Sequence, residues 1–161
     1  MKHLYLIRHA NAYPAMPGEN DFDRELSEFG TREAPKMAEK LRDLEVKPDL
    51  IISSSAKRAV TTARIFAEYL DYPKNKIHVE ETLYASSLER LIELTKELNN
   101  QNSTVLFFGH NPEFSIYAQY LTGDLTIALF PCGICGIKLD CDDWQMVSRD
   151  LGKCILLEYP S

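Results

Sequence analysis

The sequence predicts an α/β fold: a three-layer αβα sandwich with a mostly parallel central sheet. Two observations lead to this prediction. Four short apolar runs alternate with longer segments whose apolar residues recur every three or four positions, which is the pattern of alternating strands and helices. Parallel strands need crossover connections, and helices placed between them cover both faces of the sheet. No linker or internal repeat divides the 161 residues, so a single domain over residues 1–161 is expected.

The four expected parallel strands are short apolar runs bounded by polar or turn-forming residues. They are "HLYLI" (3–7), "DLIISS" (49–54), "KIHVE" (76–80) and "TVLFFG" (104–109).

Three helices are expected between these strands, each with one apolar face. Ser27 is the expected N-cap of the first helix. A fourth helix should follow the last of these strands, with Asn111 as its N-cap and Pro112 as its first residue. The apolar positions of the first three helices are Leu26, Ala34, Met37, Ala38, Leu41 and Leu44; Val60, Ala63, Ile65, Phe66, Ala67 and Leu70; and Leu88, Leu91, Ile92, Leu94 and Leu98.

The pattern changes after about residue 124. Four short strands joined by tight turns are expected there, as an antiparallel edge of the sheet: "TIALF", "GICGIKLD", "WQMVSR" and "KCILLEY", with "LDCDDW" as a hairpin turn. Residues 10–25 have no periodicity and form a segment longer than an ordinary connection. This segment is therefore a candidate functional loop.

The composition excludes several classes of partner. The net charge is −6, and no basic stripe is available to neutralise phosphates, so neither nucleic acid nor an acidic membrane is expected as a partner. No secretory signal and no membrane-spanning run is recognisable, which predicts a cytoplasmic protein. "CGIC" has the spacing of half a zinc site, but the remaining cysteines, Cys141 and Cys154, are too far apart to supply the other half. Reduced thiols are expected instead.

Basic and imidazole side chains follow three of the expected parallel strands. Arg8 and His9 come directly after the first strand, Arg58 lies in the first turn of the helix after the second, and His110 follows "TVLFFG". Ligands of open α/β sheets bind at the carboxyl ends of the strands, so these side chains should meet at one edge. The start of the helix after Asn111 would add backbone N–H donors there, and Asn111 is itself a candidate substrate contact. The sequence therefore predicts a site for a phosphoryl group.

The residue types suit transfer of that group. Arginine presents a fixed fork of donors to phosphoryl oxygens, while a neutral imidazole is a nucleophile and a protonated one is a donor. We expect His9 to attack phosphorus, with its other ring nitrogen held by a backbone carbonyl, and His110 to stabilise charge on the transferred group. A lone histidine after a strand is more often structural, and His3 and His78, which have no basic partner, are interpreted that way.

Four segments carry a family resemblance: "LIRHANA", "RELSEFG", "SSSAKRAVTTA" and "FFGHNPEFS". Together they resemble the motifs of the histidine phosphatase superfamily, which has the phosphoglycerate mutase-like fold, and most closely its short bacterial SixA-type phosphohistidine phosphatases. The resemblance covers residues 3 to about 123. It implies that His9 is the phosphorylated nucleophile, that Arg8, Arg58 and His110 form the phosphate pocket, and that no metal or organic cofactor takes part.

The sequence departs from the family pattern at two points. Relatives often have Arg-Pro-Leu where this chain has Arg24 followed by Glu25, so Arg24 is either a substrate contact or a surface salt-bridge residue. The carboxylic acid that larger relatives supply from an insertion has no clear counterpart. Glu81 is the nearest candidate by position, with Asp21 and Glu19 as others, although most acidic residues are simply on the surface.

The preferred interpretation is a phosphatase that hydrolyses phosphohistidine on a protein through a phospho-His9 intermediate. The reason is the leaving group: an imidazole leaves without strong proton donation, whereas an alkoxide needs a general acid. One alternative is a small-molecule phosphatase acting on a sugar phosphate or a nucleotide. Another is a non-catalytic phosphate-binding domain on the same fold, against which the intact set of two arginines and two histidines argues. A mutase is disfavoured because it needs a closed site that excludes water.

Overall fold

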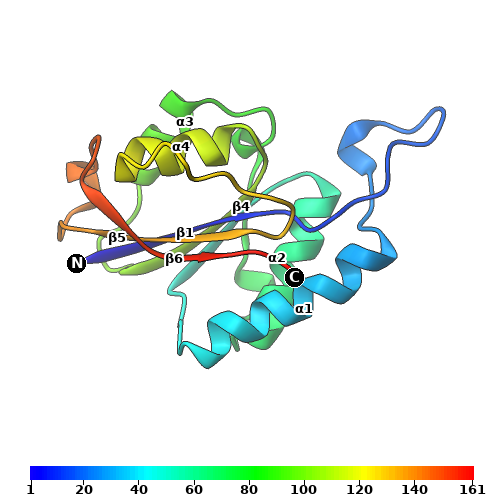
Figure 1. The fold of residues 1–161 in the computed structure, drawn as a ribbon, viewed down its shortest axis with the longest axis horizontal. Coiled ribbons are helices and arrows are strands. Elements are labelled where there is room, and N and C mark those ends of the chain that lie inside the picture. The colour runs from blue at the N-terminus through cyan, green and yellow to red at the C-terminus, as the bar shows by residue number, and fades with distance from the viewer.

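The computed structural model describes residues 1–161 and contains one six-stranded sheet with helices on both faces (Figure 1). Helices α1 and α2 cover one face, and α3 and α4 cover the other. This arrangement confirms the predicted three-layer sandwich. The strands are β1 (Lys2–Arg8), β2 (Leu50–Ser54), β3 (His78–Glu80), β4 (Thr104–Gly109), β5 (Ile134–Leu139) and β6 (Gly152–Glu158); the helices are α1 (Glu28–Asp43), α2 (Lys57–Tyr69), α3 (Leu88–Lys96) and α4 (Glu113–Thr122).

The sheet is mostly parallel, as predicted. Its strand order is β3-β2-β4-β1-β5-β6, and the pairs β3–β2, β2–β4 and β4–β1 are parallel. The pairs β1–β5 and β5–β6 are antiparallel, which confirms the expected antiparallel edge. The carboxyl ends of β1, β2, β3 and β4 therefore lie along one edge of the sheet.

Strand β1 is apolar over residues 4–7 because both of its faces are covered there. Leu4 and Leu6 belong to the core cluster under α3 and α4, whereas Tyr5 and Ile7 belong to the cluster against α1 and α2. Strand side chains alternate between the two faces of a sheet, so a strand between two helix layers needs an apolar residue at every position. Burial of β1 accounts for its apolar residues and leaves Arg8 and His9 without a structural explanation.

The first helix begins where the sequence predicts. The Ser27 hydroxyl accepts a hydrogen bond of 3.0 Å from the Gly30 backbone N–H, which satisfies one of the free donors of the first turn. Any Cβ at Gly30 would collide with the carbonyl oxygen of Asn11. The start of α1 is therefore packed directly against the backbone that follows β1.

The C-terminal third differs from the prediction. "TIALF" and "WQMVSR" are not strands, and a twelve-residue connection with a 3₁₀ turn, η4 (Trp144–Met146), replaces the expected tight hairpin turn. Ile127 and Leu129 are buried beneath α4, and the Trp144 indole is buried with its N–H donated to the Asn102 carbonyl at 2.8 Å. Their apolar side chains anchor loops to the core, which produces strand-like sequence patterns without strand pairing.

The "CGIC" segment does not bring its two thiols together. Cys132 packs in the cluster against α1 and α2, whereas Cys135 packs in the cluster on the opposite side of the sheet. All four cysteines are free; Cys132 and Cys135 are buried, while Cys141 and Cys154 are partly buried. The two thiols therefore do not form half of a zinc site.

Strand β6 is an edge strand with an irregular register. Ile137 pairs with Cys154 and Gly136 pairs with Leu156, so Ile155 has no partner and forms a β-bulge. Its side chain is 45% exposed.

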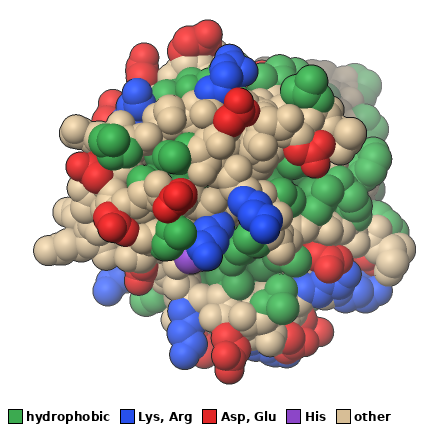
Figure 2. Space-filling model, turned by 60° about the vertical axis from the view of Figure 1, so that its left-hand side comes forward, with side chains coloured by type: hydrophobic (Ala, Val, Ile, Leu, Met, Phe, Trp, Pro, Cys, Tyr) green, Lys and Arg blue, Asp and Glu red, His purple; other side chains and the backbone are tan.

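On the face shown in Figure 2, Lys and Arg side chains are separated by acidic and apolar ones and form no continuous stripe. None of the helices has the length and hydrophobicity needed to span a membrane.

Candidate active site

A polar cavity of about 310 Å³ lies at the carboxyl ends of the parallel strands. The register places Arg8, the last residue of β1, beside Gly109, the last residue of β4. His9 and His110 follow these two strands directly, and the start of α2 brings Arg58 to the same edge. The cavity is lined by Arg8, His9, Asp21, Arg24, Arg58, Tyr84, Ala85, His110, Asn111 and Glu113.

His9 is held with one ring nitrogen free. Its Nδ1 lies 2.8 Å from the Ala10 carbonyl oxygen, and because a carbonyl only accepts, Nδ1 carries the proton and Nε2 does not. This is the backbone contact expected from the sequence. The residue is only 8% exposed. Burial, together with the charges of Arg58 and Arg8, lowers the pKa of His9 to about 4, so the imidazole is neutral at physiological pH and its Nε2 lone pair is available.

The two arginines reach the cavity with different partners. The Arg58 Nε lies 3.4 Å from His9 Nε2, and its Nη1 and Nη2 donate to Asp21. Arg8 donates from Nη1 to the Leu129 carbonyl at 3.1 Å, while its buried Nε has no hydrogen-bond partner in the protein. A buried donor without a partner is costly, so Arg8 is poised to bind an acceptor.

His110 faces His9 with a ring separation of 5.2 Å. Its Nε2 lies 2.8 Å from the Ser54 hydroxyl, and its buried Nδ1 has no partner in the protein. Burial lowers the pKa of His110 to about 3, and His9 and Arg58 add to this effect. Sequence reasoning did not single out Ser54, although it is the last residue of β2 and thus stands at the same edge as the other site residues.

Asp21 and Tyr84 complete the cavity from two loops. Asp21 lies in a 3₁₀ turn, η1 (Asp21–Asp23), within the segment 10–25. The Tyr84 hydroxyl donates to Asp21 Oδ2 at 2.7 Å, and Arg24 Nη1 lies 3.0 Å from Asp21 Oδ1. The hydrogen bonds from Tyr84, Arg24 and Arg58 hold the pKa of Asp21 well below its usual range. Asp21 was one of the weaker acid candidates from the sequence, whereas Tyr84 was missed.

Two of the sequence-based assignments need correction. Glu81 does not line the cavity; it begins a 3₁₀ turn, η3 (Glu81–Leu83), and the residue that reaches the site from this connection is Tyr84. Asn111 does line the cavity, but α4 begins at Glu113 with Pro112 as the N-cap residue, so Asn111 is not the cap.

The Asn111 side chain contributes in another way. Its amide nitrogen donates to the Leu129 carbonyl at 2.6 Å, and this carbonyl also accepts from Arg8. Its amide oxygen accepts from the Ser115 hydroxyl at 2.9 Å. Asn111 therefore fixes the loop carbonyl that orients Arg8. Glu113, which follows two residues later, lines the cavity and was not foreseen.

The lowered histidine pKa values predict how stability depends on pH. The unfolded chain binds protons on both imidazoles near pH 6.5, whereas the folded protein resists protonation of His9 until about pH 4. The unfolded state thus binds more protons in this window, so the free energy of unfolding should fall as the pH is lowered from about 6.5 to about 4. His9 alone accounts for at most roughly 3 kcal/mol.

Urea unfolding at about pH 7 and pH 4.5 measures this effect. Carboxylates also titrate at low pH, so the wild type is compared with His9→Gln, which lacks the titrating group. The variant should lose less stability than the wild type over this interval. An equal loss in the two proteins would show that His9 keeps an ordinary pKa.

Comparison with known proteins agrees with the family resemblance of the sequence motifs. The sequence profile of the histidine phosphatase superfamily (branch 1) matches residues 4–97. The candidate phosphohistidine phosphatase SixA from Agrobacterium tumefaciens has a crystal structure that superposes with a TM-score of 0.84 and is 27% identical, covering 99% of each chain.

Two curated proteins also match in sequence. An uncharacterized chloroplastic protein of Arabidopsis thaliana is 27% identical over 152 residues, which cover 89% of this chain and 69% of that protein. The mitochondrial serine/threonine-protein phosphatase Pgam5 of Drosophila willistoni is 36% identical over 76 residues. That match covers 47% of this chain and only 25% of Pgam5.

Proposed function

The chain belongs to the histidine phosphatase superfamily, and from this premise we propose that it hydrolyses phosphohistidine on a protein through a covalent phospho-His9 intermediate. The observation that carries the proposal is the unprotonated Nε2 of His9, which lies at a cavity lined by Arg8, Arg58 and His110. The likeness to the SixA candidate from Agrobacterium tumefaciens supports the same substrate class.

Two polar groups of the residues that line the cavity lack a partner within the protein. The Arg8 Nε and the His110 Nδ1 are buried and have no partner in the protein, and both residues line the cavity. Phosphoryl oxygens accept several hydrogen bonds, and arginine donors aimed at them stabilise the charge of the transition state. Arg8, Arg58 and His110 therefore bind and orient the group that His9 attacks.

The reaction proceeds in two displacements at phosphorus. In the first, the His9 Nε2 lone pair forms an N–P bond while the bond from phosphorus to the substrate imidazole breaks. The substrate ring carries a proton on its other nitrogen, so it leaves with the electron pair as neutral imidazole. In the second, a water oxygen attacks phosphorus while the bond to His9 breaks and its electron pair returns to Nε2. One proton of the water passes to a phosphoryl oxygen, and inorganic phosphate leaves. The hydrogen bond from Nδ1 to the Ala10 carbonyl keeps the ring in one orientation through both steps.

The state of Asp21 favours an imidazole as the leaving group. Asp21 accepts hydrogen bonds from Arg58, Arg24 and Tyr84 and is ionised at neutral pH, so it has no proton to donate to a departing alkoxide. An imidazole that already carries a proton on its other ring nitrogen leaves as a neutral group without such a donor. Arg24 contacts Asp21 and lines the cavity, which supports a role in binding the substrate.

Comparison of turnover across substrate classes tests the proposal. The panel consists of a phosphohistidine-bearing protein, phosphoserine and phosphotyrosine peptides, a sugar phosphate and a nucleotide, with kcat/KM measured for each. The phosphohistidine protein should be the best substrate, and Arg58→Ala should lower its kcat/KM by about 10² to 10³. His78→Ala is the matched control, because His78 lies on β3 away from the cavity.

Two outcomes would favour the alternatives. Highest kcat/KM for the sugar phosphate or the nucleotide would identify a small-molecule phosphatase. Binding of phosphate without turnover of any substrate would identify a non-catalytic phosphate-binding domain. The single-domain organisation, the cytoplasmic location and the lack of a metal requirement stay predictions.

A further inference from the structure

The cavity already contains an anion supplied by the chain itself. Asp21 Oδ2 lies 3.0 Å from Arg58 Nη2, and the Asp21 carbonyl oxygen accepts from Arg58 Nη1 at 2.7 Å. Asp21 Oδ1 accepts from Arg24 Nη1 at 3.0 Å, and Tyr84 donates to Oδ2 at 2.7 Å. One residue thus engages both terminal nitrogens of Arg58, whose Nε lies 3.4 Å from Nε2 of the nucleophile.

These are the donors that a phosphoryl group requires. Arg58 Nε points at His9 Nε2, so the end of the guanidinium that forms paired hydrogen bonds to oxygens is the end that Asp21 holds. Arg8 Nε and His110 Nδ1 remain without partners. Within the protein, one side of the site is therefore paired with a carboxylate, while polar atoms on the other side have no protein partner.

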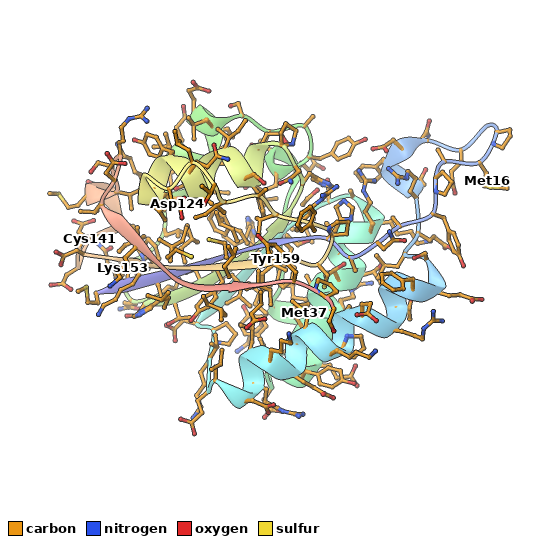
Figure 3. All side chains as sticks on the ribbon, in the orientation of Figure 1. Met16, Met37, Asp124, Cys141, Lys153 and Tyr159 are labelled. Carbon is orange, nitrogen blue, oxygen red and sulfur yellow. The ribbon has the colours of Figure 1, made fainter.

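The segment that carries Asp21 contacts the rest of the protein at its base and at the edge of the cavity. An isolated bridge between Ala12 and Leu26 closes its base, and its tip projects away from the sheet, with Met16 at the outermost part (Figures 1 and 3). The Met16 side chain is 64% exposed. The contacts that hold the 3₁₀ turn over the cavity are mainly those of Asp21 itself, together with an edge contact between the Phe22 and Tyr84 rings at 5.3 Å.

We propose that Asp21 is a built-in competitor for the phosphoryl site, so that a phosphoryl group binds Arg58 only by displacing the Asp21 carboxylate. This inference rests on the proposed function, since it takes the cavity to be a phosphoryl site. Asp21 thereby determines specificity: an anion enters only if its bonds to Arg8, Arg58 and His110 replace those of Asp21. The return of the carboxylate also assists release of inorganic phosphate, because two anions at one guanidinium repel each other.

A different role for Asp21 predicts the opposite result. If the carboxylate stays on Arg58 in the complex and only orients it, then removal of its charge should weaken phosphate binding. Asp21→Asn separates the two roles, because the amide has nearly the same size and retains an accepting oxygen but carries no charge. Asp23→Asn is the matched control, since Asp23 lies in the same 3₁₀ turn and does not line the cavity.

Binding of inorganic phosphate by calorimetry, and its inhibition of p-nitrophenyl phosphate turnover, give the decisive measurement. Asp21→Asn should bind phosphate at least about tenfold more tightly than the wild type, and Asp23→Asn should match the wild type. Unchanged or weaker phosphate binding by Asp21→Asn overturns the proposed competition by Asp21, but it does not contradict the proposed phosphoryl site. Failure of phosphate to bind the wild type and both variants overturns the proposed function together with this inference.

Hydrogen exchange in the wild type provides a second readout. The Arg24 backbone N–H donates to the Asp21 carbonyl at 3.2 Å, and that carbonyl is held by Arg58. Saturating phosphate should release this turn and speed exchange at Asp23 and Arg24, while amides of α1 stay unchanged. Slower exchange in the turn with phosphate bound would mean that the loop tightens over the anion, contrary to displacement.

Discussion

Replacement of His9 with alanine is expected to lower turnover of a phosphohistidine substrate on the order of 10⁴-fold or more while phosphate binding remains measurable. The reason is that Nε2 of His9 forms the covalent bond, whereas Arg8, Arg58 and His110, which bind the phosphoryl oxygens, stay in place. Removal of one binding donor slows the reaction, but removal of the nucleophile prevents formation of the phosphoenzyme. Steady-state kinetics together with calorimetric titration of phosphate would measure both quantities.

The control for this experiment is His78→Ala, which removes an exposed imidazole from β3 and should leave kcat and KM unchanged. Urea unfolding of His9→Ala at neutral pH verifies that the variant is folded. Retention of substantial activity by folded His9→Ala would rule out the phospho-His9 intermediate. Loss of phosphate binding along with activity would mean instead that the variant has lost the shape of the cavity.

The second large effect concerns the leaving group. Formation of phospho-His9 should slow steeply as the leaving group becomes more basic, because ionised Asp21 donates no proton to it. Phosphohistidine and p-nitrophenyl phosphate should therefore react faster than phosphoserine by about 10² to 10⁴, the range that general acid catalysis would otherwise supply. With the good substrates, hydrolysis of the common intermediate should become limiting, and their turnover numbers should converge.

Rapid quench with labelled substrates measures the first step directly. The trapped phosphoenzyme should be acid-labile and stable to base, as expected of a phosphorylated imidazole. Equal rates of phosphoenzyme formation from alkyl and aryl phosphates would require a general acid. Glu113 would then be the first residue to replace, because it lines the cavity, whereas Glu81 does not.

The part of the site carried by the strands could be predicted from the sequence. Apolar strands of a parallel sheet end at one edge, so Arg8, His9 and His110, which directly follow such runs, had to be near one another. Arg58 followed from the same reasoning, because the first turn of a crossover helix returns to that edge. Local periodicity and chain order are sufficient for these placements.

The part of the site carried by loops could not be predicted. Tyr84 and Asp21 meet across 63 positions of sequence, and their contact depends on the path of two connections that have no periodic pattern. Glu81 was preferred because it stands closest to the end of β3, but a 3₁₀ turn directs the chain so that Tyr84 reaches the cavity instead. The same difficulty explains the C-terminal third, where buried loop anchors such as Trp144 resemble strand residues.

The bulge at Ile155 affects whether the edge of β6 can pair with a strand of another copy of the protein. A regular edge strand exposes a continuous row of N–H and C=O groups that a neighbouring chain can extend into an intermolecular sheet. Strand β6 has an exposed isoleucine and leucine along that edge, which by themselves would promote aggregation. The register shift opposite Gly136 and Ile137 breaks the row in its middle, so a second chain could pair with only part of the edge. A bulge of this kind is one of the features by which edge strands avoid edge-to-edge pairing between chains.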